Sequence, residues 1–409
     1  MVKSELENYA ELIVKMGVNL QKDQVVVIQS DLENQAFAHL VQKAAYKAFA
    51  SQVFIDWSDQ ESLKQFYLHA KDEELENFPN WQIERYQQWH QMNAVFIMLI
   101  TEKPDFFAEV DSKRINRYQK IKRSCLDFHY EAIYSNRLRW CLIPVPNKSW
   151  AQKVFPCLPV EEVLDLLWDA ILIGARAKGE NPMKDWQVHD QSFELRLKTL
   201  NDQQFKALKF TNKLGTNLTV SLPKNHRFLG GSVKDVNGIS FFPNIPTEEI
   251  FTSPHREQVE GKLIGTKPLI FDNQIIEDFV LIFEKGEIVA FSAKKGEQAL
   301  ETLIAYDKGT RFLGEIALVS TQSPLFQLDT VFYNTLIDEN TACHIGIGEA
   351  NPANLVNGEH LSVEELVEAG LNDSSILVNM TFGSPDMNVL GIKEDGTKVQ
   401  LMNKGDFLF

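Results

Sequence analysis

Residues 24–57 read QVVVIQSDLENQAFAHLVQKAAYKAFASQVFIDW. The run QVVVIQS (24–30) is rich in β-branched residues, and it is followed by a segment whose apolar residues recur at helical spacing (33–50). A second strand-like run, SQVFIDW (51–57), comes next. Because a strand, a helix and a strand in this order form the repeating unit of a parallel sheet, the stretch predicts an α/β domain at the start of the chain.

The same pattern continues beyond residue 57. The strand-like runs AVFIMLI (94–100) and WCLIPVP (140–146) are separated by charged segments with amphipathic helical spacing. No glycine-rich phosphate loop follows the first strand, so the sequence does not support a nucleotide site there. We therefore expect an N-terminal α/β domain with a mostly parallel sheet over residues 1–198.

Strand signals dominate from about residue 200 onward. We expect a β-rich α+β domain of catalytic type over residues 199–409, with helices at GEQALETLIAYDKG (296–309) and at SVEELVEAG (362–370). The second helix begins with a capping box formed by Ser362 and Glu365. The expected strands are NLTVSLP (217–223), GISFFPNI (238–245), KLIGTKPLIF (262–271) and the hairpin FVLIFEKGEIVAFSA (279–293).

Composition excludes several classes of protein. The 409 residues are 44% hydrophobic and 24% charged, which is typical of a folded globular chain, and the net charge of −15 argues against nucleic acid or anionic membrane as a partner. The N-terminus lacks the pattern of a signal peptide, and no apolar run approaches the roughly 20 residues needed to span a bilayer. Four widely spaced cysteines favour neither a disulfide scaffold nor a zinc knuckle, so we expect a cytoplasmic protein.

Acidic residues in the second half could bind a divalent metal. In NIPTEEIFTSPH (244–255), Glu248 and Glu249 follow a strand and a proline turn, and strand alternation allows only one of them to point at a given site. Glu315 lies inside the apolar strand RFLGEIALVS (311–320), where an acid is costly unless it is paired, protonated or metal-bound. An acid in a strand is, however, more often at the solvent face or in a salt bridge.

A histidine follows two further acids in LIDENTACH (336–344). Asp338, Glu339 and His344 supply carboxylate and imidazole groups, which are common ligands of divalent metals. A single histidine in an apolar run is more often a hydrogen-bonded core residue than a ligand. Spacing alone does not show whether these side chains converge.

Four blocks of the chain resemble the hallmark blocks of the aminopeptidase T and aminopeptidase S metallopeptidases. They are NIPTEEIFTSPH, LGEIALVSTQSPL, TLIDENTACHIGIG and MNVLGIKEDGT, and the likeness runs nearly end to end. The resemblance implies an enzyme that removes N-terminal residues from peptides with two divalent metal ions. It also implies a cytoplasmic homodimer with an N-terminal α/β domain and a C-terminal catalytic domain.

The resemblance assigns roles to individual residues of this chain. It makes Glu249, Glu315, Glu339 and His344 metal-ligand positions. It also makes Glu315 a candidate bridging ligand or general base.

The resemblance breaks in GLNDSSILVNMTFGS (370–384). An alignment without gaps puts Leu377 where the family has a ligand histidine and Asn379 where it has a ligand aspartate, while Asn351 occupies the position of the family's catalytic tyrosine. Leucine cannot ligate a metal, and Asn379 can offer only a neutral amide oxygen. Asn351 could still donate a hydrogen bond to an oxyanion, as amide side chains do in other enzymes.

These substitutions change the charge available to a metal centre. Glu249, Glu315 and Glu339 supply three negative charges against the four of two divalent ions, so two ions are harder to hold than one. We expect zinc, cobalt or manganese, as one ion or two, with Asn379 as an additional weak ligand. Other acids and a histidine in the neighbouring blocks are more typical of solvated loops: Glu349, Glu359, His360, Asp373 and Asp386.

Three functions remain open from the sequence. The first is a metal-dependent aminopeptidase that acts on peptides, with Glu315 and Asn351 as catalytic residues. The second is a catalytically impaired or inactive paralogue that binds peptides or serves as a dimer partner. The third is a metal-dependent enzyme with different chemistry, because a fold does not determine a function.

Overall fold

The computed structural model describes residues 3–272 and 274–409, which divide into two compact units. The first unit contains the described residues up to Gln187 together with Ser232–Pro246, and the second contains Val188–Gly231 and Thr247–Phe409. The boundary between the two units, after Gln187, falls inside helix α10 (Pro182–Gln203). No helix in the described part of the chain is long and apolar enough to cross a membrane.

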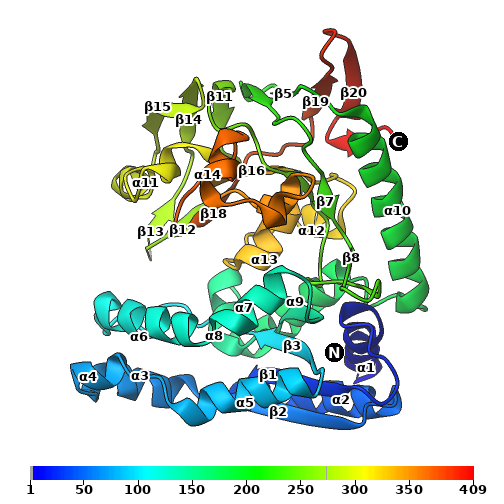
Figure 1. The fold of residues 1–409 in the computed structure, drawn as a ribbon, viewed down its shortest axis with the longest axis vertical. Coiled ribbons are helices and arrows are strands. Elements are labelled where there is room, and N and C mark those ends of the chain that lie inside the picture. Colours follow the sequence, from blue (N-terminus) through cyan, green and yellow to red (C-terminus); the bar gives the residue numbers. More distant parts are fainter. Residues whose placement is uncertain (1–2, 273) are drawn as a thin grey trace. The chain divides into compact units, whose positions relative to one another are not determined.

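The first unit is built on a four-stranded parallel sheet in the order β2-β1-β3-β4, which confirms the parallel sheet predicted from the sequence (Figure 1). The strands are β1 (Val25–Asp31), β2 (Gln52–Ser58), β3 (Val95–Ile100) and β4 (Trp140–Pro144). Its helices are α1 (Lys3–Leu12), α2 (Gln35–Lys47), α3 (Gln60–His69), α4 (Asp72–Leu75), α5 (Asn80–Gln91), α6 (Ser112–Cys125), α7 (Asp127–Tyr134), α8 (Lys148–Val154) and α9 (Val160–Gly174).

Helix α2 shows why the opening stretch folds as predicted. Its buried positions are Phe37, Ala38, Val41, Ala44 and Ala45, which recur every three or four residues and so share one face of the helix. This face packs on β1 and β2. The apolar period of the sequence is therefore the period of the buried face.

The segment 238–245 differs from its predicted strand. Only Ser240–Phe241 forms a strand, β9, which pairs with β8 (Val233–Lys234). Pro243 lacks a backbone N–H, so it cannot donate the hydrogen bond that would extend strand pairing through this position. Instead, Leu142 N donates to Pro243 O at 2.7 Å and Ile245 N donates to Leu142 O at 3.2 Å, so the chain extends along β4.

Two histidines of the first unit form a neutral pair. His90 Nε2 and His129 Nδ1 lie 2.9 Å apart, so one ring donates a hydrogen bond and the other accepts it. His129 is 3% exposed and packs edge-on against the rings of Tyr86 and Phe96. Burial, then the charges of His90 and Lys122, lowers the pKa of His129 from its ordinary value to about 3.

We expect this pair to make the protein sensitive to acid. Below pH 6.5 the unfolded chain protonates His129 while the folded chain does not, so its contribution to stability is complete above that pH and is lost as the pH falls toward 3. Between pH 7 and pH 5 the free energy of unfolding should fall by about 2 kcal/mol more in the natural protein than in His129→Leu. Urea unfolding at both pH values measures this difference, and equal losses in the two proteins would contradict it.

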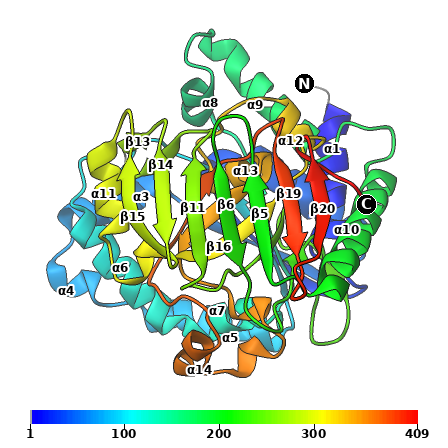
Figure 2. The same ribbon diagram turned by 90° about the horizontal axis from the view of Figure 1, so that it is seen from above.

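The second unit consists mainly of two antiparallel sheets. Figure 2 shows the strands of the larger one side by side, and this sheet has eight strands in the order β15-β14-β11-β6-β5-β19-β20-β21. Its strands are β5 (Ala207–Thr211), β6 (Asn217–Ser221), β11 (Val259–Ile264), β14 (Val280–Glu284), β15 (Glu287–Ser292), β19 (Asn388–Ile392), β20 (Lys398–Asn403) and β21 (Asp406–Phe407).

The smaller sheet has five strands in the order β18-β17-β16-β10-β7. They are β7 (Leu229–Gly230), β10 (Ile250–Thr252), β16 (Leu313–Leu318), β17 (His344–Gly348) and β18 (Leu377–Thr381). The remaining elements of the unit are β12 (Leu269–Phe271), β13 (Gln274–Ile276), α11 (Glu297–Ile304), α12 (Pro324–Gln327), α13 (Thr335–Asp338) and α14 (Val363–Glu368).

The core of the second unit joins the two sheets. Ile316, Ile345 and Met380 are partners in one row across β16, β17 and β18, and each is 0% exposed within a core that also contains Leu218 and Val220 of β6. Because alternate residues of a strand point to opposite faces, the neighbouring row of the same three strands must point away from this core. That neighbouring row carries the candidate site.

Several sequence predictions for the second unit are confirmed and two are wrong in extent. The hairpin at 279–293 forms as β14 and β15, and Ser362 and Glu365 make the predicted capping box. The run 262–271 is two strands, separated between Ile264 and Leu269 at a segment that contains Pro268. The helix expected at 296–309 ends at Ile304, because the Asp307 carboxylate accepts the N–H groups of Gly309 and Thr310 in a turn.

Candidate metal centre

The face of the smaller sheet opposite the core brings predicted site residues together. Glu315 on β16 pairs with Gly346 on β17, which pairs with Asn379 on β18, so the three occupy one row. His344 lies two residues before Gly346 and therefore points to the same face. Leu377 lies two residues before Asn379 and shares this face as well.

Gly346 allows the neighbouring side chains on this face to approach the strand closely. A Cβ atom at Gly346 would lie 2.9 Å from Glu315 Cβ, 2.8 Å from Asn379 Oδ1 and 2.6 Å from Leu377 Cδ1. Contacts below 3.0 Å are repulsive, so a larger residue would push these side chains apart. The glycine thus lets the side chains of the cluster pack closely against the strand backbone.

We expect Gly346→Ala to disturb both the fold and the arrangement of the cluster. Glu315 Cβ is attached directly to the strand backbone and cannot rotate away, so the added methyl group should cost about 1–3 kcal/mol of stability, as overpacking generally does. Thermal unfolding and metal titration of the same preparation measure the two effects. A variant with unchanged stability and unchanged metal affinity would show that the close packing at Gly346 has no role.

Three ligand-type side chains meet at this face. Within the described residues, one group of at least three such side chains has ligand atoms all within 4.8 Å of one another, and it consists of Glu249, Glu315 and His344. His344 Nε2 lies 3.1 Å from Glu249 Oε2 and 3.2 Å from Glu315 Oε1. The three belong to different segments, since Glu249 directly precedes β10 while the others lie on β16 and β17.

The adjacent acids Glu248 and Glu249 point to different partners, as strand alternation predicts. Glu249 faces His344, whereas Glu248 Oε1 lies 3.9 Å from Nε2 of His189. His189 Nε2 also lies 2.8 Å from Thr247 O. Glu248 is therefore held away from the cluster.

Burial makes the charges of this cluster costly. Loss of water raises the pKa of Glu315, and the nearby charge of Glu249 raises it further. The pKa of Glu339 is raised well above its usual range for the same two reasons. Burial alone would lower the pKa of His344, but the carboxylates of Glu249 and Glu315 raise it well above its ordinary value.

The donor set fits a divalent cation. Asn379 Oδ1 is buried and accepts no hydrogen bond within the described residues, and Glu249 Oε2 is buried with the ion pair to His344 as its contact. A buried oxygen without a hydrogen-bond donor costs free energy unless another group satisfies it. Two or three carboxylates facing one imidazole exceed the charge that a protonated histidine can balance, and carboxylate oxygen with imidazole nitrogen is a common ligand set for zinc, cobalt and manganese.

Glu339 reaches the same row through Asn379. Asn379 Nδ2 donates to Glu339 Oε2 at 2.9 Å, which leaves Asn379 Oδ1 as the unpartnered atom beside Gly346. Glu339 begins the short 3₁₀ helix Glu339–Thr341 and lies outside the group of three. Its carboxylate and the amide of Asn379 thus form a polar border of the cluster.

The two other substituted positions differ in their surroundings. Leu377 is 41% exposed at the first residue of β18, on the cluster's face of the sheet. Asn351 is exposed, and its Oδ1 accepts the Ala353 N–H at 3.0 Å as the cap of a 3₁₀ turn. Among the remaining acids and histidine of these blocks, Asp386 is partly buried and the others are exposed: Glu349, Glu359, His360 and Asp373.

Sequence reasoning missed Asn340, which is fully buried between the acidic segments. Its Oδ1 accepts hydrogen bonds from Glu248 N and Glu249 N. An asparagine next to Glu339 in a chain with many asparagines carries no distinguishing signal. Its partners lie 91 and 92 residues earlier in the chain, so only the tertiary structure shows that they are in contact.

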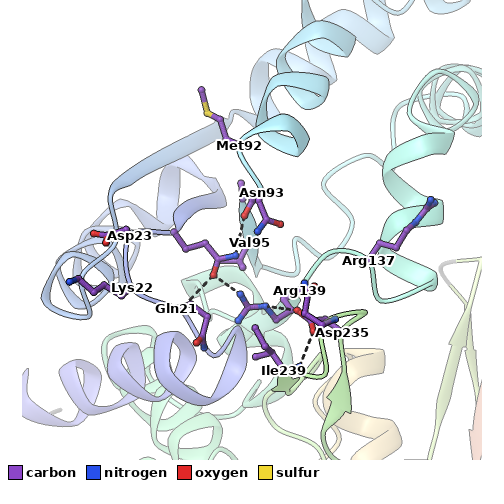
Figure 3. Close-up of a pocket in the computed structure, with 13 residues that line it drawn as sticks. Gln21, Lys22, Asp23, Met92, Asn93, Val95, Arg137, Arg139, Asp235 and Ile239 are labelled. Atoms are coloured by element: carbon purple, nitrogen blue, oxygen red, sulfur yellow. Dashed lines mark hydrogen bonds and ion pairs between the residues drawn. The ribbon is translucent and has the colours of Figure 1, made fainter.

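A cavity in the first unit has a different character. It has a volume of about 340 Å³ and includes Gln24, Arg137, Arg139 and Asp235 among its lining residues (Figure 3). Arg139 is 4% exposed and donates to Val18 O, Asn19 O and Gln24 Oε1, while its Nε lies 3.2 Å from Asp235 Oδ2. The guanidinium is engaged within the fold, so we interpret it as structural.

Comparison with known proteins identifies the family of the chain. The profile of the thermophilic metalloprotease (M29) family matches residues 2–407. The chain belongs to the M29 family. It is 38% identical over 405 residues to aminopeptidase AmpS of Bacillus subtilis strain 168, covering 99% of this chain and 98% of that protein. It is also 38% identical over 407 residues to aminopeptidase 2 of Geobacillus stearothermophilus, covering 100% and 98%.

A solved structure has the same fold. Wild-type AmpT from Thermus thermophilus superposes with a TM-score of 0.91 at 34% identity, and the match covers 100% of both chains. The family resemblance and the α/β fold class expected from the sequence are both confirmed. M29 membership identifies this chain with a family of metal-dependent hydrolases, and the family implies a divalent metal.

Proposed function

We propose that this protein is a metal-dependent aminopeptidase that releases N-terminal amino acids from peptides. The observation that carries the proposal is the meeting of Glu249, Glu315 and His344 on one face of the sheet, with ligand atoms within 4.8 Å of one another. The aminopeptidases of the family that match the whole chain support the same activity. The centre would hold one divalent ion, of zinc, cobalt or manganese.

The proposed ligands are Glu249, Glu315 and His344, with Glu339 and Asn379 at the border of the site. A bound divalent cation supplies Lewis-acid polarisation of the scissile carbonyl and lowers the pKa of a water molecule. The Glu315 carboxyl is enclosed beside His344 in this cluster, and we propose that it passes a proton from the attacking water to the leaving amine. Asn351 Oδ1 accepts the Ala353 N–H in the 3₁₀ cap. Its side chain would have to leave this cap to donate a hydrogen bond to an oxyanion of the substrate.

One experiment separates this proposal from an inactive protein. Purified protein is dialysed, its metal content is determined by elemental analysis, and release of amino acids from unblocked dipeptides is followed with added cobalt, zinc or manganese. We expect one ion per chain and release with at least one of the metals. No bound metal and no release with any ion would defeat the proposal.

A second candidate function has a specific observation in its favour. Leu377, at a position where the family has a ligand histidine, lies on the cluster's own face of the sheet, and Asn379 replaces a charged ligand beside it. A protein with these substitutions could bind peptides without cleaving them, or act as a partner of an active copy. Tight binding of dipeptides without product release would support this alternative.

The proposal also covers the oligomeric state and the cellular location of the protein. By its family resemblance the protein is proposed to be a cytoplasmic homodimer that acts on peptides and binds neither nucleic acid nor membrane. Its four cysteines, Cys125, Cys141, Cys157 and Cys343, are all unbridged, which is compatible with a reducing compartment. Light scattering of the purified protein distinguishes a dimer from a monomer.

A further inference from the structure

The two acidic segments of the site are joined by one buried side chain. Asn340 is 0% exposed, and its Oδ1 accepts hydrogen bonds from Glu248 N at 2.6 Å and from Glu249 N at 3.2 Å. Its Nδ2 donates to Leu336 O at 2.8 Å. The amide orientation is fixed by chemistry, because the oxygen faces two N–H donors and the nitrogen faces a carbonyl.

The segment that carries Glu249 has few other ways to satisfy its backbone. Strand β10 begins only at Ile250, so Glu248 N and Glu249 N lie ahead of the ladder that pairs the strand with its neighbours. Buried N–H groups need acceptors, and the Asn340 carboxamide takes the place of a neighbouring strand here. The direction in which the Glu249 side chain leaves the backbone therefore depends on Asn340.

The segment that carries Asn340 is itself fixed. Asp338 Oδ1 accepts from Phe332 N at 2.8 Å and Oδ2 accepts from Asn334 N at 3.0 Å, while Thr341 Oγ1 donates to Asp338 O at 2.6 Å. These bonds fold residues 332–341 into a closed turn around helix α13. Asn340 thus joins the segment that precedes β10 to this hydrogen-bonded turn.

From these contacts we propose that Asn340 is a positioning residue for the metal centre. By holding the backbone of Glu249, it sets the carboxylate of Glu249 against His344 and keeps Glu339, its neighbour in sequence, at the border of the same cluster. The inference rests on the proposed metal-dependent function, since it concerns the ligands of that centre. It assigns to Asn340 no contact with substrate or metal.

The test compares zinc affinity in variants of the full chain, measured by competition with a chelating dye. Asn340→Ala should weaken zinc binding by about 10- to 100-fold, the usual range for residues that support metal ligands. Asn340→Asp keeps an acceptor for both N–H groups and should bind zinc clearly more tightly than the alanine variant. Asn340→Ser replaces the alanine variant in this comparison if alanine does not fold.

Asn372 provides a matched control. It is 4% exposed, and its Nδ2 donates to Gly309 O at 2.9 Å and Gly348 O at 2.6 Å. Asn372→Ala therefore also removes a buried carboxamide, but this carboxamide accepts no hydrogen bond from the backbone N–H of a proposed metal ligand. Thermal unfolding without metal records the stability cost of each variant. We expect both alanine variants to lose stability and only Asn340→Ala to lose zinc affinity.

The possible outcomes separate this inference from the proposed function. If the natural protein binds no zinc, cobalt or manganese, the proposed function fails and the inference fails with it. If the natural protein binds zinc, and Asn340→Ala binds it equally well or Asn372→Ala is weakened to the same degree, the inference alone is overturned. Affinity of Asn340→Asp as weak as that of Asn340→Ala would also overturn it.

Discussion

A Glu315→Gln protein is expected to fold normally and to lose peptide hydrolysis. Glutamine preserves the shape of the side chain but removes its negative charge and its ability to carry a proton, which should slow dipeptide cleavage by about 10²- to 10⁴-fold. Metal affinity should fall as well, because one of three carboxylates around the centre is neutralised. Steady-state kinetics with unblocked dipeptides and metal titration measure the two losses.

The same substitution should not destabilise the metal-free protein. Burial and the charge of Glu249 raise the pKa of Glu315, so a neutral amide relieves a cost that the metal-free fold bears. Thermal unfolding after chelation should give a midpoint equal to or above that of the natural protein. Glu359→Gln, at an exposed position, is the control and should change none of these properties. Full hydrolytic activity in Glu315→Gln would contradict a role for Glu315.

The combined variant Leu377→His, Asn379→Asp and Asn351→Tyr is expected to bind two divalent ions per chain instead of one. Leu377 and Asn379 lie on the face that carries Glu315 and His344, so an imidazole and a carboxylate at these positions would add ligands and a fourth negative charge beside the first ion. A phenol at residue 351 supplies a longer hydrogen-bond donor. Together the changes should increase dipeptide hydrolysis on the order of 10²-fold.

The control for this variant carries Leu377→Gln in place of histidine. Glutamine is polar and similar in size but is a poor ligand, so the control should bind a single ion and gain little activity. Elemental analysis of both proteins gives the number of ions per chain. The prediction is wrong if the natural protein already binds two ions and cleaves peptides as fast as the combined variant.

Periodicity in the sequence predicted much of the fold but not the convergence of the site. The β-branched runs at 24–30 and 94–100 and the apolar period of 33–50 are local signals, and each became β1, β3 or α2. The turn at Glu284-Lys285-Gly286 likewise predicted the hairpin of β14 and β15. Such signals depend on neighbouring residues alone, so the sequence contains them directly.

The site depends on register, which no local pattern contains. Glu315, Gly346 and Asn379 lie in one row only because β16, β17 and β18 pair in the observed register, and a shift of one residue would turn the side chains of Glu315 and Asn379 toward the core. The family resemblance indicated Glu249, Glu315, Glu339 and His344 as ligands. The structure brings Glu249, Glu315 and His344 together, while Glu339 lies outside this group. Asn340 escaped prediction because its partners are contributed by a distant segment.

Sequence periodicity was also misleading at residues 238–245. The alternating apolar residues there resemble a strand, yet Pro243 prevents a full ladder, and the segment instead extends along β4 within the first compact unit through single hydrogen bonds. Strand-like composition predicts an extended chain. It does not predict which sheet receives that chain.

Anomalous diffraction from crystals grown with zinc would locate any ion bound at the cluster. We expect one strong anomalous peak within bonding distance of Glu249, Glu315 and His344, and no second peak beside Leu377. A map without a peak at this cluster, in which His344 and the two carboxylates form only a salt bridge, would contradict it.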